Sequence, residues 1–176
     1  NCHTGKWPNR FRDSWERLIK FNKSKHFNMY QDAVMVPIGD WAKVRLKNLS
    51  ETDKTRDNAK TGSGFGKKIS NWIDRKMVYP SNVVSFATEC GNKNHSAVFP
   101  RELPAWFIKL FTTEGDTVLD PFMGSGTTIS VAHQMRRNSI GIEILPDYYN
   151  YVVNDVYEKP SYPLIDEEIY EFHQAK

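Results

Sequence analysis

The residues best suited to chemistry form a glycine-rich turn at positions 120–128. The string there reads Asp-Pro-Phe-Met-Gly-Ser-Gly-Thr-Thr, with glycines at Gly124 and Gly126. These glycines permit a tight turn and let a ligand approach the backbone closely. A helix beginning just after the turn presents free N–H groups and a positive dipole end, which suit a carboxylate or a phosphate. Thr127 or Thr128 can cap that helix.

An acidic residue, Glu143, stands downstream of this turn. It lies 23 residues after Asp120, close to the roughly 20-residue spacing at which an acid binds ribose hydroxyls in nucleoside-binding α/β folds. The three-glycine dinucleotide pattern fails, because Ile129 occupies the third position. Turn and acid together predict a site for a ligand with a ribose and an amino-acid or phosphate group. The alternative is a tight structural turn with a surface glutamate.

The elements that would position these residues alternate between strand and helix. Short apolar runs predict buried strands over residues 117–120 and 139–144. Helical spacing predicts a helix after each strand, over residues 127–136 and 146–156, the second with proline at its start. This order is a βαβ unit, so the predicted fold class is α/β with a parallel sheet.

The sequence upstream is less regular. Residues 15–21 and 26–30 are typical of a β-hairpin with a four-residue loop. Periodicity fades over residues 37–76. A strand is expected over residues 82–88 and a helix over residues 101–113.

Positive charge gathers in one part of the chain. The net charge is only +3, but residues 43–76 hold ten Lys and Arg against four Asp and Glu. Residues 99–176 hold six against twelve. This asymmetry indicates a surface that faces a polyanion, and a solvated basic loop without a partner fits the charge equally well.

Composition excludes several classes of protein. Hydrophobic residues at 39% and charged residues at 26% are typical of a globular domain. No apolar run approaches the roughly 18 residues that a membrane span needs, and the two cysteines are interpreted as reduced thiols, so we expect a cytoplasmic protein. Cys2 and Cys90 are too few for a disulfide framework and lack partners at zinc spacing, so no metal is predicted. The chain opens on Asn1, so we expect a fragment, a processed product or one part of a split protein.

Three stretches of the sequence resemble one protein family. The string at positions 120–128 is similar to the cofactor motif of the DNA methyltransferases that make N4-methylcytosine or N6-methyladenine. Residues 94–104, Asn-His-Ser-Ala-Val-Phe-Pro-Arg-Glu-Leu-Pro, resemble the segment before that motif in the β-type order. In that order the catalytic half comes first, then the target-recognition region, then the cofactor motif. Residues 10–21 resemble the late-sheet hairpin that ends the catalytic half.

The resemblance implies S-adenosylmethionine as the cofactor and assigns roles to matching residues. Asp120 would hold the methionine amino group, and Thr127 would lie beside the carboxylate. Glu143 would accept the ribose hydroxyls, with Ile144 against the adenine. The other residues implied in cofactor binding are Phe122, Gly124 and Gly126 of the turn, and His95, Ser96, Phe99 and Pro100 on the opposite side of the cofactor. The structural alternatives make Phe99 and Phe122 core aromatics and His95 a loop histidine.

The resemblance places a target-recognition region over the basic residues. Lysine and arginine there would neutralise phosphates of double-stranded DNA. The residues predicted to contact DNA are Lys60, Phe65, Lys67, Lys68, Arg75 and Lys76.

One motif of the family is absent from these 176 residues. Family members carry a Ser/Asp/Asn-Pro-Pro-Tyr/Phe tetrapeptide, which holds the target amino group and stacks the flipped base. The chain has nine prolines, and no two are adjacent. We therefore predict no catalytic residue in this chain and expect it to be inactive alone. Its expected partner is an N-terminal half with the tetrapeptide, or a second copy joined through the open sheet.

The resemblance thus implies an incomplete Rossmann-like methyltransferase sheet with a late β-hairpin and an inserted basic segment. The expected parts are a hairpin over residues 1–36, a basic recognition segment over residues 37–80, a cofactor-binding βαβ portion over residues 81–158 and an acidic tail over residues 159–176. The His-Ser-Ala-Val-Phe-Pro form is similar to that of several N4-cytosine enzymes and favours N4 of cytosine over N6 of adenine. The resemblance also implies a restriction-modification context in a prokaryote or phage. The alternatives are a non-catalytic cofactor- or DNA-binding remnant, and a complete methyltransferase for a small molecule or protein. The basic segment and the incomplete set of strands argue against the last.

Overall fold

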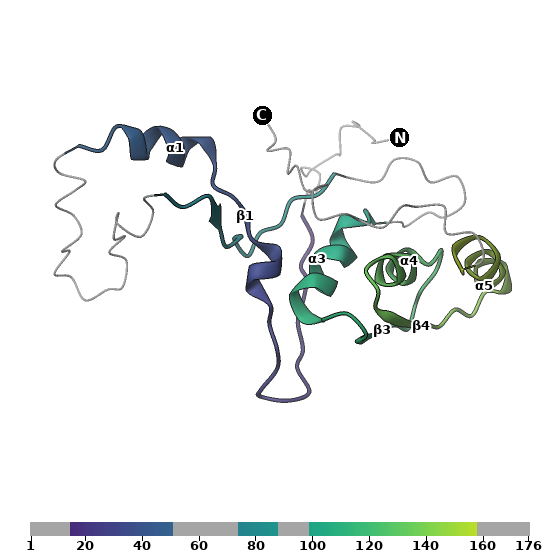
Figure 1. Ribbon diagram of the computed structural model, residues 1–176. Coiled ribbons are helices and arrows are strands. Elements are labelled where there is room, and N and C mark those ends of the chain that lie inside the picture. The colour runs from purple at the N-terminus through teal and green to yellow at the C-terminus, as the bar shows by residue number, and fades with distance from the viewer. Residues whose placement is uncertain (1–14, 51–73, 88–98, 158–176) are drawn as a thin grey trace, which may run out of the picture. The chain divides into compact units, whose positions relative to one another are not determined.

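The computed structural model describes residues 15–50, 74–87 and 99–157, which belong to two compact units (Figure 1). The first, the βα unit, contains the described residues 15–30, 85–87 and 99–157. The second, the small unit, contains residues 31–50 and 74–84. Within these described ranges no helix has the length and apolar character that a bilayer span requires.

A parallel pair of strands lies at the centre of the βα unit. β3 (Thr117–Asp120) and β4 (Asn138–Gly141) pair in parallel, with Leu119 opposite Ile140. α4 (Thr127–Gln134) connects the two strands and packs against both, as the crossover between adjacent parallel strands requires. The predicted βαβ order and parallel pairing are confirmed.

The chain after β4 is helical, as the sequence predicts. α5 (Pro146–Tyr151) has proline in its first turn, where the missing N–H needs no partner. It continues into η4 (Val152–Tyr157), a π-helical segment. Val152 is 1% exposed and forms a buried cluster with Met123 and Ile129. This cluster ties the end of α5 to the turn after β3 and to α4.

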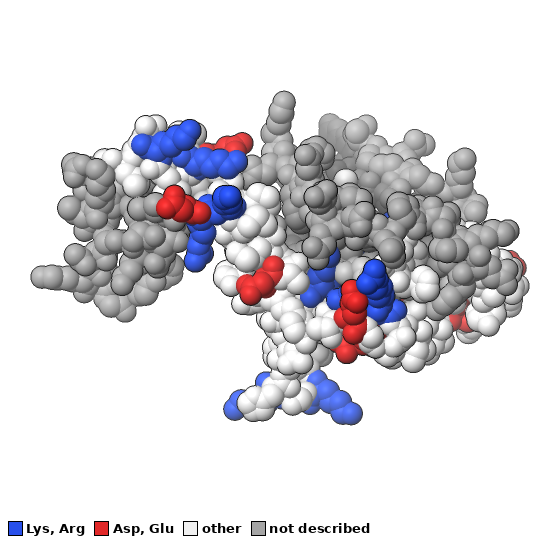
Figure 2. All heavy atoms as spheres, viewed as in Figure 1, with Lys and Arg blue, Asp and Glu red and all other residues white. Residues whose placement is uncertain are grey.

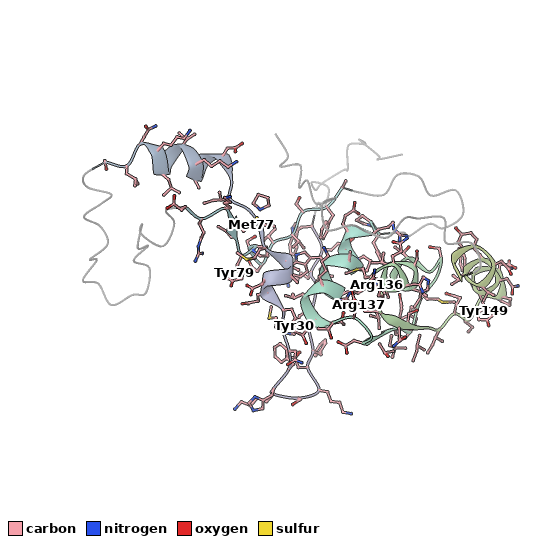
Figure 3. All side chains as sticks on the ribbon, in the orientation of Figure 1. Tyr30, Met77, Tyr79, Arg136, Arg137 and Tyr149 are labelled. Atoms are coloured by element: carbon pink, nitrogen blue, oxygen red, sulfur yellow. The ribbon has the colours of Figure 1, made fainter. Side chains whose placement is uncertain are left out.

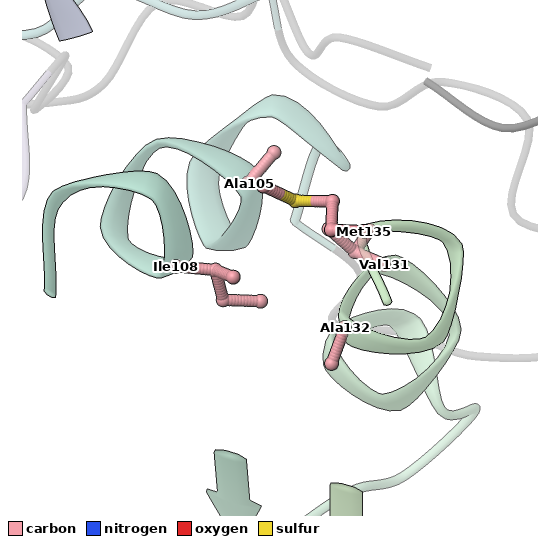
Figure 4. Close-up of a cluster of buried hydrophobic side chains, with 5 residues drawn as sticks. All are labelled: Ala105, Ile108, Val131, Ala132 and Met135. Atoms are coloured by element: carbon pink, nitrogen blue, oxygen red, sulfur yellow. The ribbon is translucent and has the colours of Figure 1, made fainter. Parts of the chain in front are cut away.

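The main core of the unit lies between α4 and α3 (Glu102–Phe111). Figure 4 shows the five side chains that meet there, namely Ala105, Ile108, Val131, Ala132 and Met135. Val118 of β3 packs against the same cluster. α3 confirms the helix predicted over residues 101–113. Its apolar face packs against α4.

Two arginine side chains form hydrogen bonds at the edges of this core. Arg101, just before α3, donates from Nη2 to Ser130 Oγ at 3.1 Å and to Gln134 Oε1 at 2.7 Å. Arg137 donates from Nη2 to the Thr112 carbonyl at 3.0 Å and from Nε to Thr112 Oγ1 at 3.1 Å. These bonds satisfy polar groups that the packing of α3 on α4 removes from water.

The face of the strand pair that points away from α4 is exposed. Successive strand residues point to opposite faces, so Val118 enters the core while Leu119 does not. Leu119, Ile140 and Ile142 are 59%, 54% and 55% exposed. We call these three side chains the bare face. Because parallel sheets are buried on both faces in folded domains, the bare face is one that a further layer is needed to cover.

Residues 15–30, the hairpin segment, run out, reverse and return (Figure 1). No strand is assigned in this segment, so the predicted β-hairpin ladder is not found. The two legs meet through side chains instead, with Lys20 Nζ 3.5 Å from the centroid of the Phe27 ring. The strand predicted over residues 82–88 is also not found in its described part, residues 82–87. Both segments lack a neighbouring strand to pair with among the described residues, and isolated strands are not stable in water.

The small unit holds two short strands and two helical segments. They are η1 (Gln31–Val34), a 3-10 helix, then β1 (Val36–Pro37), α1 (Asp40–Lys47) and β2 (Met77–Val78). β1 and β2 pair antiparallel. Tyr79 Oη donates to Asp32 Oδ1 at 2.8 Å, and Figure 3 shows Tyr79 beside Met77 of β2. The sequence did not predict α1, because charged residues interrupt its apolar face.

Candidate functional site

The carboxyl ends of β3 and β4 bring two acidic residues to one edge of the sheet. Asp120 is the last residue of β3, and Glu143 lies two residues after β4. The Ile142 N–H donates to the Asp120 carbonyl at 2.9 Å, so the strands remain paired up to this edge. Ligands of open α/β sheets bind outside the carboxyl ends of the strands. The edge is therefore the position at which this fold class holds a ligand.

A glycine turn leads from β3 into α4, as the sequence predicts. Gly124 has φ +52° and Gly126 has φ +79°, a left-handed conformation that glycine adopts without steric cost. The Gly126 N–H donates to the Met123 carbonyl at 2.8 Å and closes the turn. A Cβ added to Gly126 would lie 2.7 Å from Val152 Cγ2. The absent side chain of Gly126 thus makes room for Val152, a packing requirement that the sequence did not reveal.

Glu143 connects the turn with the start of α5. Its Oε2 accepts a hydrogen bond from the Gly124 N–H at 2.9 Å, and its Oε1 accepts one from the Leu145 N–H at 2.9 Å. At the other strand end, Asp120 Oδ1 accepts a hydrogen bond from the Phe122 N–H at 3.0 Å. Each carboxylate oxygen offers two lone-pair sites, so these bonds orient the acids and leave acceptor capacity for a ligand.

Both carboxylates at this edge are half-buried. Across the described residues, no group of three or more His, Cys, Asp or Glu is arranged to hold a metal ion. The two carboxylates offer oxygen acceptors for hydroxyl or ammonium groups.

Two large apolar side chains stand exposed beside these acids. Phe122 follows Asp120 in the turn and is 88% exposed, and Ile144 follows Glu143 and is 91% exposed. Phe122 is therefore not a core aromatic. Exposed apolar groups next to a few oriented polar groups are typical of a surface that receives the apolar part of a ligand.

The start of α4 is formed by backbone groups. Gly126 is the N-cap residue and no side chain caps the helix, so the prediction that Thr127 or Thr128 caps it is wrong. Thr127 is the first residue of the helix. The first intrahelical bond runs from the Ser130 N–H to the Gly126 carbonyl at 2.8 Å. The three N–H groups before Ser130 lie at the positive end of the helix dipole, which favours an anion.

The remaining predicted cofactor residues are only partly described. Phe99 is 39% exposed and Pro100 is half-buried, both just before α3. His95 and Ser96 lie outside the described residues.

Of the residues predicted to contact DNA, the structure describes Arg75 and Lys76. Both are exposed, immediately before β2 in the small unit. The Lys76 carbonyl accepts a hydrogen bond from the Ile38 N–H at 2.9 Å, which holds this stretch beside β1. The other four, Lys60, Phe65, Lys67 and Lys68, lie outside the described residues.

Sequence reasoning missed Met123, the residue that packs the glycine turn against the core. Met123 is 7% exposed, packs with Ile129 and Val152, and donates its N–H to the Ile142 carbonyl at 3.0 Å. A Cβ added to Gly141 would overlap the Met123 sulfur. The available signal was an apolar side chain directly before the first glycine of the turn.

Comparisons with known proteins show which family the chain is similar to. The N6_N4_Mtase family model, described as DNA methylase, matches residues 2–154. The Type II methyltransferase M.PvuII of Proteus hauseri is 32% identical over 152 residues, which cover 79% of this chain and 44% of that protein. M.BglI of Bacillus subtilis is 47% identical over 79 residues, 45% of this chain and 21% of that protein. The chain thus spans less than half the length of these curated relatives.

Two solved structures are also similar. The PvuII DNA methyltransferase, titled cytosine-N4-specific, matches with a TM-score of 0.40 and 32% identity over 43% of this chain and 31% of that one. A DNA modification methylase of Thermus thermophilus, complexed with S-adenosyl-L-methionine, matches with a TM-score of 0.33 and 37% identity over 34% of this chain and 25% of that one. The family model covers most of the 176 residues, and the chain therefore belongs to the DNA methylase family.

Proposed function

We propose that this chain is the cofactor-binding and DNA-facing portion of a site-specific DNA amino-methyltransferase of a restriction-modification system. One observation carries the proposal: the acids Asp120 and Glu143 and the glycine turn share the carboxyl edge of the strand pair, with Phe122 and Ile144 exposed beside them. Family membership supports the class of reaction, and the arrangement of residues at the edge supports it as the place where the cofactor would bind.

The chemistry of this edge fits S-adenosylmethionine group by group. The Asp120 carboxylate suits the methionine ammonium, because the pairing is charge-assisted. The N–H groups at the start of α4, beginning at Thr127, suit the methionine carboxylate. Glu143 suits the ribose hydroxyls, since the bonds to Gly124 and Leu145 fix its orientation in advance.

Apolar side chains complete the cofactor site. Ile144 would cover one face of the adenine, and Phe122 would close the turn over the methionine part. His95, Ser96, Phe99 and Pro100 would line the other side of the cofactor. Bound in this way, S-adenosylmethionine supplies the methyl group, and the residues of this chain hold and orient it while excluding water.

Transfer also requires acceptors that draw the lone pair of the target amino group out of conjugation with the base. We assign that role to a Ser/Asp/Asn-Pro-Pro-Tyr/Phe tetrapeptide on an N-terminal segment outside these residues, so that the 176-residue chain is inactive alone. The bare face supports this assignment, because Leu119, Ile140 and Ile142 need a covering layer. Such a segment would extend the sheet and place the tetrapeptide beside the cofactor edge.

Double-stranded DNA is the proposed substrate, and the basic segment is its proposed recognition region. Arg75 and Lys76 are exposed in the small unit, where lysine and arginine can reach phosphates. We favour N4 of cytosine over N6 of adenine, because residues 95–100 have the His-Ser-Ala-Val-Phe-Pro form, which is similar to that of several N4-cytosine enzymes. The second candidate, a non-catalytic cofactor- or DNA-binding remnant, is favoured by the absent tetrapeptide.

A methyl-transfer assay separates the two candidates. The chain is mixed with duplex DNA and radiolabelled S-adenosylmethionine, with and without a polypeptide that carries the tetrapeptide. Label in the DNA from the mixture alone supports the methyltransferase, and mass spectrometry of the nucleosides identifies N4-methylcytosine or N6-methyladenine. Cofactor binding without any transfer in the mixture supports the remnant.

A further inference from the structure

The hairpin segment is held firmly to α3 at its base. The Tyr30 N–H donates to the Leu110 carbonyl at 2.7 Å. The Phe27 ring lies 6.5 Å from the Phe111 ring, centroid to centroid, and Phe111 stacks on Phe107 at 6.3 Å. Aromatic pairs at these separations attract each other beyond the area that they bury. The returning leg of the segment is therefore a fixed part of the βα unit.

Lys20 fixes the outgoing leg to the same place. Its Nζ lies 3.5 Å from the centroid of the Phe27 ring and 4.5 Å from that of Phe111. A cation over two aromatic faces is attracted by both ring quadrupoles. The legs are thus joined by Lys20, although no backbone ladder connects them. The tip between the legs projects from an anchored base.

The tip is basic and has a defined turn. The His26 N–H donates to Ser24 Oγ at 3.2 Å, which shapes the reversal. Lys23 and Lys25 flank Ser24 and are exposed. Positions 17–31 contain one arginine and three lysines and no Asp or Glu. Figure 2 shows Lys and Arg gathered at the end of this projection, with no acidic side chain beside them.

We propose that Lys23 and Lys25 contact the phosphate backbone of duplex DNA, as a DNA contact separate from the basic recognition segment. Three features favour duplex DNA as the partner of the tip: the charge of the tip is of one sign, the tip projects, and its base is rigid. Flexible ammonium groups on a fixed support neutralise phosphates without reading bases, so the contact adds affinity and orientation rather than sequence specificity. This inference rests on the proposed DNA methyltransferase function.

The test measures DNA affinity of the full chain against salt concentration. The double variant Lys23→Gln/Lys25→Gln is expected to bind DNA more weakly and to lower the slope of log K against log salt by about two, roughly one for each lost phosphate contact. Lys23→Arg/Lys25→Arg keeps the charge and is expected to keep the slope. Arg136→Gln is the control, because Arg136 is exposed in the same unit and is already paired with an acid. Its Nη1 lies 3.7 Å from Glu114 Oε2. Its slope is expected to match the wild type.

The outcomes separate this inference from the function on which it rests. If the wild-type chain binds DNA and the double glutamine variant keeps its slope, the hairpin assignment is overturned and the methyltransferase proposal stands. The hairpin assignment is also overturned if Arg136→Gln lowers the slope by about half as much as the double variant does. The loss of slope per charge removed would then be equal at the two places, which is an effect of net charge. If the folded wild type binds no duplex even at low salt, both proposals fail.

Discussion

Glu143 accepts a hydrogen bond from the backbone N–H of Gly124 at 2.9 Å, so the acid that follows β4 is tied to the turn that follows β3. The bond brings together two segments 19 residues apart in sequence. Glu143 therefore holds the turn, in addition to its proposed role in binding ribose. The two roles predict different consequences of substitution.

Replacing Glu143 by alanine is expected to affect both properties. Loss of the charge-assisted bonds should weaken S-adenosylmethionine binding by about 1–3 kcal/mol. The unfolding free energy should fall too, because the N–H groups of Gly124 and Leu145 lose their acceptor. Glu143→Gln keeps one acceptor oxygen and should recover part of the stability with little recovery of binding. Calorimetry and chemical denaturation measure the two, and unchanged affinity in both variants would remove Glu143 from the ligand site.

The packing of Val152 against the glycine turn predicts a large effect at Gly126. Gly126→Ala combines a left-handed backbone with overlap on Val152, whereas Gly115→Ala has a left-handed φ of +85° and no atom within 4 Å. The control therefore isolates the backbone cost. Gly126→Ala should destabilise the chain by about 1–3 kcal/mol more than Gly115→Ala. Equal unfolding free energies for the two variants would show that Val152 does not fill the space beside Gly126.

Acid stability should depend on Asp116. Its Oδ2 accepts hydrogen bonds from the Thr113 N–H at 2.7 Å and the Thr113 hydroxyl at 3.0 Å, and these bonds lower the pKa of the carboxyl. A pKa lower in the folded than in the unfolded state gives stability that is present above the unfolded pKa. That stability is lost as pH falls through the folded pKa. Thr113→Ala removes the hydroxyl donor, so the pKa of Asp116 should rise partway to its usual value in an NMR titration. A pKa that does not move would assign the shift to another cause.

The sequence predicted local elements better than their partners. β3, α4 and β4 were found close to their expected bounds, because apolar runs and a glycine turn specify them locally. The hairpin ladder and the strand over residues 82–88 were not found in the described residues. A strand depends on a neighbour elsewhere in the sheet, and no local pattern supplies one.

The site shows the same division. The positions of Asp120 and Glu143 at one edge follow from βαβ topology, which spacing reveals. The closeness of Gly126 to Val152 depends on how the chain at the end of α5 packs against the turn, and that of Met123 to Gly141 on how the turn packs against β4. Spacing in the sequence encodes neither. The cap of α4 was wrong for a similar reason. Threonine is a common N-cap, but here the left-handed Gly126 takes that position.

The basic recognition segment predicts a salt-dependent DNA contact at Lys67 and Lys68. Lys67→Gln/Lys68→Gln should weaken DNA binding and lower its salt slope by about one to two, since each phosphate contact releases counterions. Fluorescence anisotropy over a salt series measures the slope, with Arg136→Gln as the single-charge control. A slope equal to that of the wild type would mean that the pair faces solvent.

The central claim is that S-adenosylmethionine binds at the carboxyl edge of β3 and β4, and Ile144 provides its cleanest test. Ile144 is 91% exposed, so its truncation removes no core packing, and Ile19, 74% exposed on the hairpin segment, is a matched control. Calorimetric titration should show that Ile144→Ala binds S-adenosylmethionine more weakly by about 1–2 kcal/mol, on the order of 5- to 30-fold. Ile19→Ala should bind the cofactor as the wild type does. Equal affinity of all three proteins would contradict the assigned site. So would the absence of binding by the folded chain, both alone and mixed with a tetrapeptide-bearing polypeptide.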